Sequence, residues 1–350
     1  MKQLKKYKLF ILISLSSFLA YADRTLIFAI DIIRHGDRTP TTEIPKDPYS
    51  WQEGLGELTA NGMKQEFNLG KNLRNKYVVQ YKLLPAKYNN DFIYVRSSDY
   101  NRTLMSAQSV LLGLYPLGTG PIISTEQVSA LPMGYQPIPI HTVPQANDSV
   151  LVPRQNKQKF NLLMKKYVFY SEAWQKKTIQ YQSKIKRWNQ ITGISINDLK
   201  QVGPLGDNLY IRMLYGIPMP KGITIKDRDE IIKLKEWVVS HTFSPYNFGY
   251  YASKDLRETI AKYLINASNS TSKLKYVLFS AHDSILMSIM SALHKPLKNI
   301  PPYASDLNIL LFKDNLDKQY YVQLKFNESE INLKGCQKFC NLSEFLKYLN

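Results

Sequence analysis

Residues 26–40 read LIFAIDIIRHGDRTP, and the fold that we predict starts from this stretch. Its first eight residues form an apolar run with β-branched members, which is typical of a buried strand. Arg34, His35 and Arg38 follow at once. A cluster of charged and titratable side chains therefore stands directly after a strand of the core.

Two other segments repeat this arrangement. Residues 91–95 (DFIYV) predict a second buried strand, and Arg102 falls in the first turn of the helix after it. Residues 276–280 (YVLFS) predict a third, which His282 and Asp283 follow. Ligands of open α/β sheets bind beyond the carboxyl ends of the strands, so we expect the three clusters at one edge of the sheet. Such charges need partners when buried, and a shared anion would supply one.

The wider pattern predicts an α/β fold with a central, mostly parallel sheet between helices. Residues 153–244 read as mostly helical and basic, so we predict an inserted helical cap there and a core formed by residues 23–152 and 245–350. The other elements that we expect are a helix over 60–77 capped by Thr59, a strand over 137–143 that contains a buried His141, a helix from Ser284, a hairpin of 307–312 with 320–326, and a last helix capped by Asn341.

The N-terminus has the pattern of a secretory signal peptide over residues 1–22. A basic MKQLKKYK precedes the short apolar run Leu9–Leu19, and Ala20-Tyr21-Ala22 gives the small residues expected before cleavage after Ala22. The alternative is an uncleaved anchor, but the run is too short to span a bilayer comfortably. We expect an exported protein, periplasmic or secreted, without stable insertion in a membrane.

The chain is strongly basic, with 46 Lys and Arg against 28 Asp and Glu and a formal net charge of +18. An exported protein of this charge is expected to meet anionic ligands or surfaces. Residues 154–187 alone hold ten basic residues and one acid. They form either a solvated helix face or a rim that attracts polyanionic substrates. A nucleic acid is not expected as a specific partner.

The two cysteines, Cys336 and Cys340, are spaced for a small loop. In an oxidising compartment they can form a disulfide bond. A zinc site would need two more ligands nearby, and neither a histidine nor another cysteine lies close in the sequence. We therefore favour the disulfide, and we expect no metal site and no cofactor.

The residue types at the three strand ends fit phosphoryl transfer. Arginines present fork-shaped donors that match phosphate oxygens and stabilise charge on the transferring group. A neutral imidazole can attack phosphorus and become a phosphohistidine. A carboxylic acid beside it can protonate the departing alkoxide. Three arginines would supply the positive charge that other phosphoryl-transfer enzymes take from metal ions.

The motifs resemble those of the histidine acid phosphatase family. Residues 34–40 match its Arg-His-Gly-x-Arg-x-Pro signature, and His282-Asp283 matches its second signature. The likeness to the prostatic and lysosomal members continues in order along the chain, in LTANGMKQEFNLGKNLRNKY, YVRSSDYNRTLMSA, QPIPIHTVP, VLFSAHDS, PPYAS and the late Cys-x-x-x-Cys. The basic middle of the chain carries the least of it.

The resemblance implies a phosphoglycerate-mutase-like core with a helical cap. It implies that His35 is the nucleophile and forms a phosphohistidine, and that Asp283 is the proton donor. By the same resemblance Arg34, Arg38, Arg102 and His282 bind the phosphoryl group. Ser98 stands where these relatives usually have threonine. Burial and a neighbouring phosphate should raise the pKa of Asp283, so we expect an acidic pH optimum.

Several alternatives stay open at this stage. A phosphoglycerate-type mutase would share the superfamily, but export and the His282-Asp283 pair argue against it. A phytase is closer, and a substrate panel would separate it from a broad phosphatase. A non-catalytic anion-binding protein would show salt-sensitive binding without turnover. The Asn101 sequon beside Arg102 favours a bacterial protein that is never glycosylated, and the oligomeric state is a monomer or a homodimer.

Overall fold

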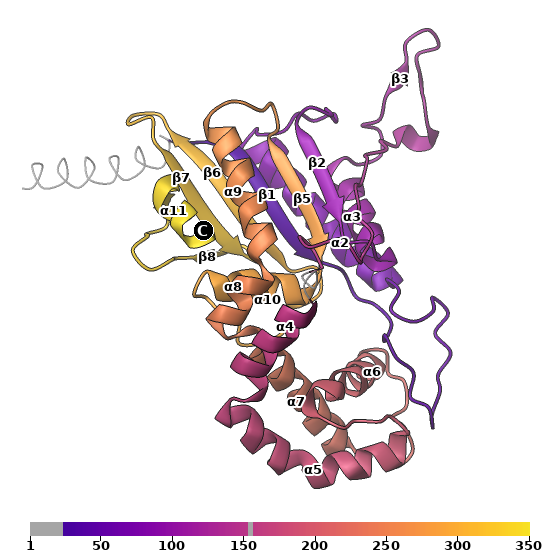
Figure 1. Ribbon diagram of the computed structural model, residues 1–350. Helices are drawn as coiled ribbons and strands as arrows, with labels where there is room; N and C mark the ends of the chain where they lie inside the picture. The colour runs from indigo at the N-terminus through magenta and orange to yellow at the C-terminus, as the bar shows by residue number, and fades with distance from the viewer. Residues whose placement is uncertain (1–23, 153–156) are drawn as a thin grey trace, which may run out of the picture.

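The computed structural model describes residues 24–152 and 157–350, and the predicted signal peptide and its cleavage site lie outside these residues. A seven-stranded sheet forms the centre, in the order β2-β5-β1-β6-β7-β8, with β9 paired to β7. Its strands are β1 (Arg24–Arg34), β2 (Ile93–Ser97), β5 (Tyr276–Ala281), β6 (Asp306–Asp314), β7 (Tyr320–Phe326), β8 (Ser329–Ile331) and β9 (Cys340–Asn341). Residues Ile122–Ile123 (β3) and Val128–Ser129 (β4) form a separate small hairpin, which projects from the molecule in Figure 1.

The sheet is mixed. Strands β2, β5 and β1 run parallel, whereas β6 is antiparallel to β1 and the strands beyond it continue antiparallel. The α/β class is confirmed, but parallel pairing is confined to one half of the sheet. In that half Arg34 lies beside Ala281 and Ser97 lies beside Ser280, so the three parallel strands end at the same edge. Figure 1 shows this edge facing the helices of residues 157–243.

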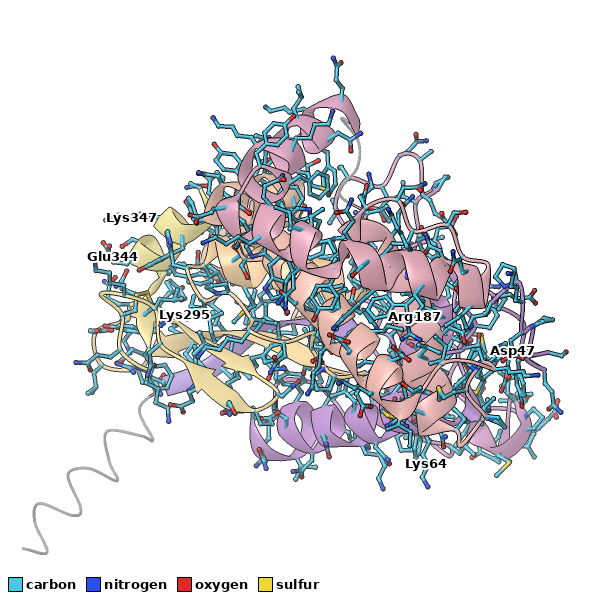
Figure 2. The ribbon with its side chains drawn as sticks, turned by 90° about the horizontal axis from the view of Figure 1, so that it is seen from below. Asp47, Lys64, Arg187, Lys295, Glu344 and Lys347 are labelled. Atoms are coloured by element: carbon cyan, nitrogen blue, oxygen red, sulfur yellow. A yellow bond between two sulfur atoms is a disulfide. The ribbon has the colours of Figure 1, made fainter. Side chains whose placement is uncertain are left out.

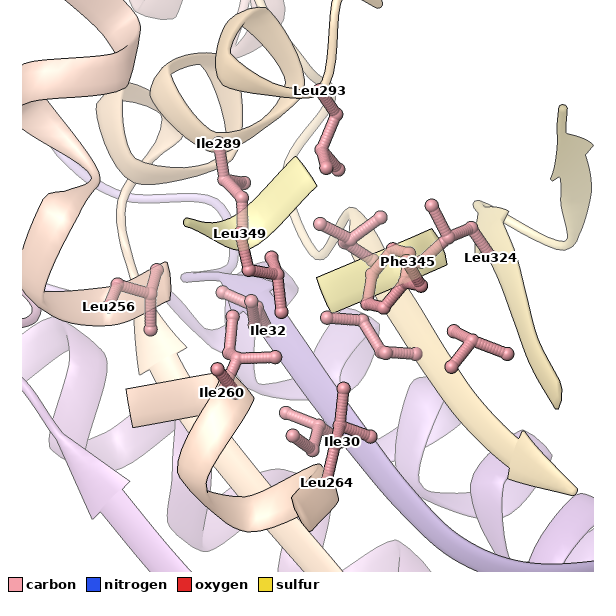
Figure 3. Close-up of a cluster of buried hydrophobic side chains, with 14 of the residues drawn as sticks. Ile30, Ile32, Leu256, Ile260, Leu264, Ile289, Leu293, Leu324, Phe345 and Leu349 are labelled. Carbon is pink, nitrogen blue, oxygen red and sulfur yellow. The ribbon is translucent and has the colours of Figure 1, made fainter. Parts of the chain in front are cut away.

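Helices cover both faces of the sheet. On one face lie α2 (Ala60–Arg74) and α3 (Asn101–Leu114), and on the other lie α9 (Lys254–Ser268), α10 (Asp283–Ala292) and α11 (Leu342–Leu349). Alternate residues of β1 pack against the helices on opposite faces of the sheet, because successive strand side chains point to opposite faces. Ile30 and Ile32 pack with Ile260 of α9 and Phe345 of α11 (Figure 3), while Ile33 packs toward α2 and α3.

The remaining helices follow one another between β4 and α9. They are α4 (Lys157–Met164), α5 (Glu172–Thr192), α6 (Val202–Leu214), α7 (Ile225–Phe243) and α8 (Tyr246–Ala252). Short 3-10 or π segments lie in the same part of the chain at Pro132–Gly134, Lys165–Phe169 and Leu199–Gln201, and a further one, Asn75–Gln80, directly follows α2. Helices α5, α6 and α7 share a hydrophobic cluster of their own, centred on Trp188, Leu209 and Ile231. Figure 1 shows these three helices below the end of the sheet.

The basic stretch on α5 is partly neutralised. Lys184 pairs with Glu230, and Arg187 (Figure 2) pairs with Asp227, so both acids come from α7. Lys176 pairs with Glu172 within α5 at 2.6 Å. Part of the charge therefore joins α5 to α7 and does not form an open cationic rim.

One expected strand is absent from its place. Residues 137–143 make only an isolated bridge between His141 and Arg96, and His141 is exposed and stacks on Tyr94 with ring centroids 4.9 Å apart. Pro137 and Pro139 lack the N–H that a sheet ladder needs, which explains why the apolar alternation was misleading. The predicted caps are confirmed, since Thr59 accepts from Gly62 N and Asn341 accepts from Ser343 N.

Cys336 and Cys340 form the predicted disulfide. Among the described residues, no helix is long and apolar enough to cross a membrane. The same residues contain no group of three or more His, Cys, Asp or Glu placed to hold a metal ion.

A close approach of two glycines fixes how α2 and α3 pack. A Cβ on Gly113 of α3 would lie 2.3 Å from the Phe67 carbonyl oxygen and 2.7 Å from Lys71 N, both on α2. A Cβ on Gly70 of α2 would lie 2.0 Å from the Val110 carbonyl oxygen. Helix α2 contacts the loop after β1, and α3 begins directly after the loop that follows β2. The contact between the two helices therefore also sets the distance between those loops.

We expect Gly113→Ala to destabilise the protein by about 1–3 kcal/mol, because the backbones of α2 and α3 must separate. Urea unfolding followed by circular dichroism measures this. Gly203→Ala is the matched control, since it is also helical and has no atom within 4 Å of the added methyl group. The control should be neutral or slightly stabilising. Equal unfolding midpoints for the two variants would contradict the packing argument.

Candidate active site

The predicted site residues gather at the edge where the three parallel strands end. Arg34 is the last residue of β1 and His35 follows it, while Arg102 is the second residue of α3, after β2. His282 is the N-cap residue of α10, directly after β5. The ring centroids of His35 and His282 lie 5.5 Å apart. Strands that are far apart in sequence thus deliver both histidines to one place.

His35 is buried and adopts a defined tautomer. Its Nδ1 lies 2.8 Å from the carbonyl oxygen of Gly36. A carbonyl oxygen only accepts, so Nδ1 carries the hydrogen and Nε2 carries the lone pair. Burial lowers the pKa of His35 well below its ordinary value, and the charges of Arg34 and Arg38 lower it further. The ring is therefore neutral, with Nε2 free to act as a nucleophile.

The glycine of the motif lets α2 approach the loop that holds His35. A Cβ on Gly36 would lie 2.5 Å from the Gly62 carbonyl oxygen at the start of α2. The Gly36 amide donates to Ser106 Oγ of α3 at 3.1 Å. The loop after β1 is thus fixed by both helices on this face of the sheet.

Three guanidinium groups surround the ring of His35, and the Nε atom of each is unsatisfied. Arg34 Nη2 lies 3.1 Å from Asp283 Oδ2, and the Arg34 guanidinium lies 4.3 Å from the centre of the Tyr303 ring. Arg102 lies over Tyr100 at 4.5 Å. In the part of the chain that the structure describes, Nε of Arg34, Arg38 and Arg102 is buried without a hydrogen-bond partner. Buried donors without acceptors are rare, so this cluster is shaped for an anion.

His282 is held beside this cluster. Its Nε2 lies 3.0 Å from the Ser98 hydroxyl, so the serine that replaces threonine keeps the contacting group. Burial, together with Arg102, lowers the pKa of His282 to about 3. His282 is therefore a neutral hydrogen-bonding group over the ordinary pH range.

Asp283 differs from the expectation. Its side chain is 29% exposed, and its Oδ1 accepts from Ser284 N at 2.7 Å. Burial alone would raise the pKa of Asp283, but the charges of Arg34 and Arg38 outweigh burial and hold the pKa below its ordinary value. Without a bound phosphate, the carboxyl group is ionised rather than poised as an acid.

Sequence reasoning missed two residues of the site, Asp207 of α6 and Lys235 of α7. Asp207 accepts from both terminal nitrogens of Arg38, at 2.7 Å and 3.2 Å, and Lys235 Nζ lies 3.1 Å from Asp207 Oδ1. Neither belongs to a motif. The available signal was weak: Asp207 is an acid between the buried apolar positions Leu205 and Leu209.

Asp37 ties the same loop to the helical segment. It accepts from Thr59 Oγ1 at 2.6 Å and from the hydroxyl of Tyr215, at the end of α6. A cavity of about 710 Å³ opens beside it, with Arg34, Asp37, Lys235 and Tyr303 among its lining residues. Arg34 lines this cavity and His35 does not. The cavity therefore lies beside the arginines and does not include the imidazole.

Comparisons with known proteins agree with this geometry. Residues 25–202 match the family model of the histidine phosphatase superfamily (branch 2). Lysosomal acid phosphatase of Bos taurus is 32% identical over 93% of this chain and 77% of its own length. Prostatic acid phosphatase of Homo sapiens is 31% identical over 92% of this chain and 84% of its own.

Solved structures give the same fold at lower identity. The apo form of Hafnia alvei phytase superposes with a TM-score of 0.67 over 94% of this chain and 97% of its own, at 18% identity. The phytase from Citrobacter braakii superposes equally well, with a TM-score of 0.67 at 15% identity. The matched family model, the identity to curated relatives and the shared fold together show that this chain is a member of the histidine acid phosphatase family, in branch 2 of the histidine phosphatase superfamily.

Proposed function

We propose that the protein is an acid phosphatase that hydrolyses phosphomonoesters through a phosphohistidine on His35. One observation carries the proposal: a neutral imidazole with a free Nε2 lies among three guanidinium groups whose Nε atoms are buried and, among the described residues, have no hydrogen-bond partner. A phosphoryl group would satisfy these donors and present its phosphorus to the ring. The acid phosphatases among the relatives support the same activity.

The first half of the reaction would transfer the phosphoryl group to the enzyme. Nε2 of His35 attacks phosphorus while the bond to the leaving oxygen breaks, and Asp283 gives its proton to that oxygen. Arg34, Arg38 and Arg102 hold the equatorial oxygens and stabilise their charge. In the second half, a water molecule attacks the phosphohistidine and Asp283 takes the proton, which regenerates the free imidazole and releases phosphate.

The proton for the first half must arrive with the substrate. Arg34 keeps Asp283 ionised in the empty site, so the enzyme alone supplies no acid. A phosphomonoester has a second pKa of ~6, so below this pH it carries one proton into the site. Once the ester is bound, the arginines favour its dianion, and Asp283, which pairs with Arg34, would receive the proton. This transfer would give an acidic pH optimum although the pKa of Asp283 is lowered in the empty site.

We further propose that residues 153–244 act as a cap on a core of residues 23–152 and 245–350. The cap proposal rests on the separate hydrophobic cluster of α5 to α7 and on the reach of Asp207 and Tyr215 to the loop after β1. The protein would be exported after loss of residues 1–22, as a monomer or a homodimer. The phytase neighbours share only the fold at this identity, and no contact in the site favours inositol phosphates over other esters.

His35→Ala should abolish turnover, with a fall on the order of 10⁶-fold in kcat, as for other covalent nucleophiles. The assay uses p-nitrophenyl phosphate near pH 5 in the presence of EDTA, and acid-free quenching of the wild type should trap phosphate on His35. His241→Ala is the matched control, because His241 stacks on Trp237 in α7, away from the arginines. Retained turnover in His35→Ala, or label on another residue, would overturn the proposal.

The fall of kcat/KM on the alkaline side of the pH profile should follow the second pKa of the substrate and not the pKa of an enzyme group. The pKa of His35 and that of Asp283 are both lowered, so neither group changes charge near pH 6 in the free enzyme. Above its second pKa of ~6 the ester loses the proton that Asp283 needs, and kcat/KM should fall about tenfold per pH unit. Profiles for an aryl and an alkyl phosphate, whose second pKa values differ, test this. If kcat/KM falls at the same pH for both substrates, the titrating group belongs to the enzyme and the proposal is wrong.

Asp283→Asn should harm alkyl esters more than aryl esters. An alkoxide is a strong base that needs its proton in the transition state, whereas a nitrophenolate departs with little protonation. The loss in kcat/KM for alkyl esters should reach ~10²–10⁴-fold. A plot of kcat/KM against leaving-group basicity should be steep for the variant and shallow for the wild type. Parallel plots would place the proton donor elsewhere.

A further inference from the structure

The donors of Arg38 can be counted one by one. A guanidinium has five N–H groups in one plane. Nη1 of Arg38 donates to Asp207 Oδ2 at 2.7 Å and to the Thr39 carbonyl at 2.9 Å, and Nη2 donates to Asp207 Oδ1 at 3.2 Å. Three donors are thus committed to the protein. The two that remain are Nε–H, which is buried without a partner among the described residues, and the second N–H of Nη2.

The two remaining donors lie on a single edge of the guanidinium. Nε–H and the outer N–H of Nη2 point the same way in the planar group, and together they match two oxygens of one phosphoryl group. The carboxylate of Asp207 occupies the opposite end, formed by Nη1 and Nη2. The position of Asp207 therefore decides which edge of the guanidinium remains open.

Asp207 is itself held tightly. It is only 5% exposed, and its Oδ1 also accepts from Lys235 Nζ at 3.1 Å. Burial would raise the pKa of Asp207, but Arg38 and Lys235 outweigh it and hold that pKa well below its ordinary value. The carboxylate thus keeps its charge at the acidic pH at which the enzyme would work.

The packing of α6 on α7 is built to bring Lys235 to this carboxylate. A Cβ on Gly206, the neighbour of Asp207, would lie 2.6 Å from Lys235 Cβ. Only glycine at this position lets the backbone of α6 come so close to the Lys235 side chain. A glycine inside a helix costs about 1 kcal/mol relative to alanine, which the close contact must offset.

We propose that Asp207 is a positioning residue for phosphoryl transfer: it grips the end of the Arg38 guanidinium and thereby turns the Nε edge toward the phosphoryl group, with Lys235 as its buried partner. The inference rests on the proposed function, because it assigns Arg38 to the phosphoryl group. It adds that the orientation of this arginine is set by the helical segment and not by the strand that carries it.

A double-mutant cycle separates positioning from a merely structural ion pair. Asp207→Asn keeps the shape but loses the charge and one acceptor, so kcat/KM and vanadate affinity should each fall about 10- to 100-fold, as for loss of one oriented charged hydrogen bond. In an Arg38→Ala background the same change should cost less than about threefold, because Asp207 then has no guanidinium to orient. Equal losses in both backgrounds would overturn the proposal.

Asp227→Asn is the matched control. Asp227 is another buried acid of the helical segment, but its partners are Arg187, Trp188 and Thr224, and it bonds to none of the three arginines of the site. This variant should lower the unfolding midpoint and leave vanadate affinity unchanged. If Asp207→Asn does not fold, Asp207→Glu replaces it. The glutamate carboxylate lies one methylene further from the backbone, so it should misplace Arg38 and weaken vanadate binding. In the Arg38→Ala background, Asp207→Glu should leave vanadate affinity unchanged.

The outcomes also separate this inference from the function beneath it. Turnover that survives His35→Ala removes the proposed function, whatever Asp207 does. A phosphohistidine on His35 together with an additive Asp207 and Arg38 cycle removes the inference alone. A drop in vanadate affinity of the same size for Asp227→Asn would also remove it, because the effect would then follow stability and not the orientation of Arg38.

Discussion

The rest of the site depends on three guanidinium groups that lie near one imidazole, each with a buried Nε atom. Desolvated positive charges are costly unless they meet partners, and they repel one another. The parallel strands force this proximity because they end at one edge. Tyr303 and Tyr100 offer ring faces to Arg34 and Arg102, which eases the desolvation. Burial and the charges of these arginines keep His35 neutral, which is the state that the proposed nucleophile needs.

The surrounding acids are arranged so that they do not fill the anion site. Asp207 and Asp283 each pair with one arginine and leave its Nε free. Glu66 is fully buried on α2, and burial raises its pKa well above the ordinary value, so it is uncharged. Asp306 is likewise kept neutral by burial and by the nearby Asp31. Ionised carboxylates in these places would compete with phosphate for the arginines. Their neutrality leaves a net positive field at the end of β1.

The sequence allowed the three strand ends and their residues to be predicted, since a buried strand followed by a charge is a local pattern. Asp207 could not be predicted in this way, because it contacts Arg38 only when α6 packs against the loop after β1. The hairpin of β6 and β7 was predicted and is confirmed, but the antiparallel pairing of β6 with β1 was not predicted, because the order of strands in a sheet cannot be read from any one segment. The lowered pKa of Asp283 depends on Arg34, 249 positions away, and only the folded structure shows which of two opposing effects is larger.

The three arginines are held by different parts of the fold, and this matters for substrate specificity. Arg34 and Arg102 are fixed by the sheet and the loops beside it, whereas Arg38 is gripped from α6. The proposed phosphate site would therefore be complete only when the helical segment is in place. Changes in that segment can alter the orientation of Arg38 without touching the strand ends, so the chemistry can stay constant while the preferred leaving group changes.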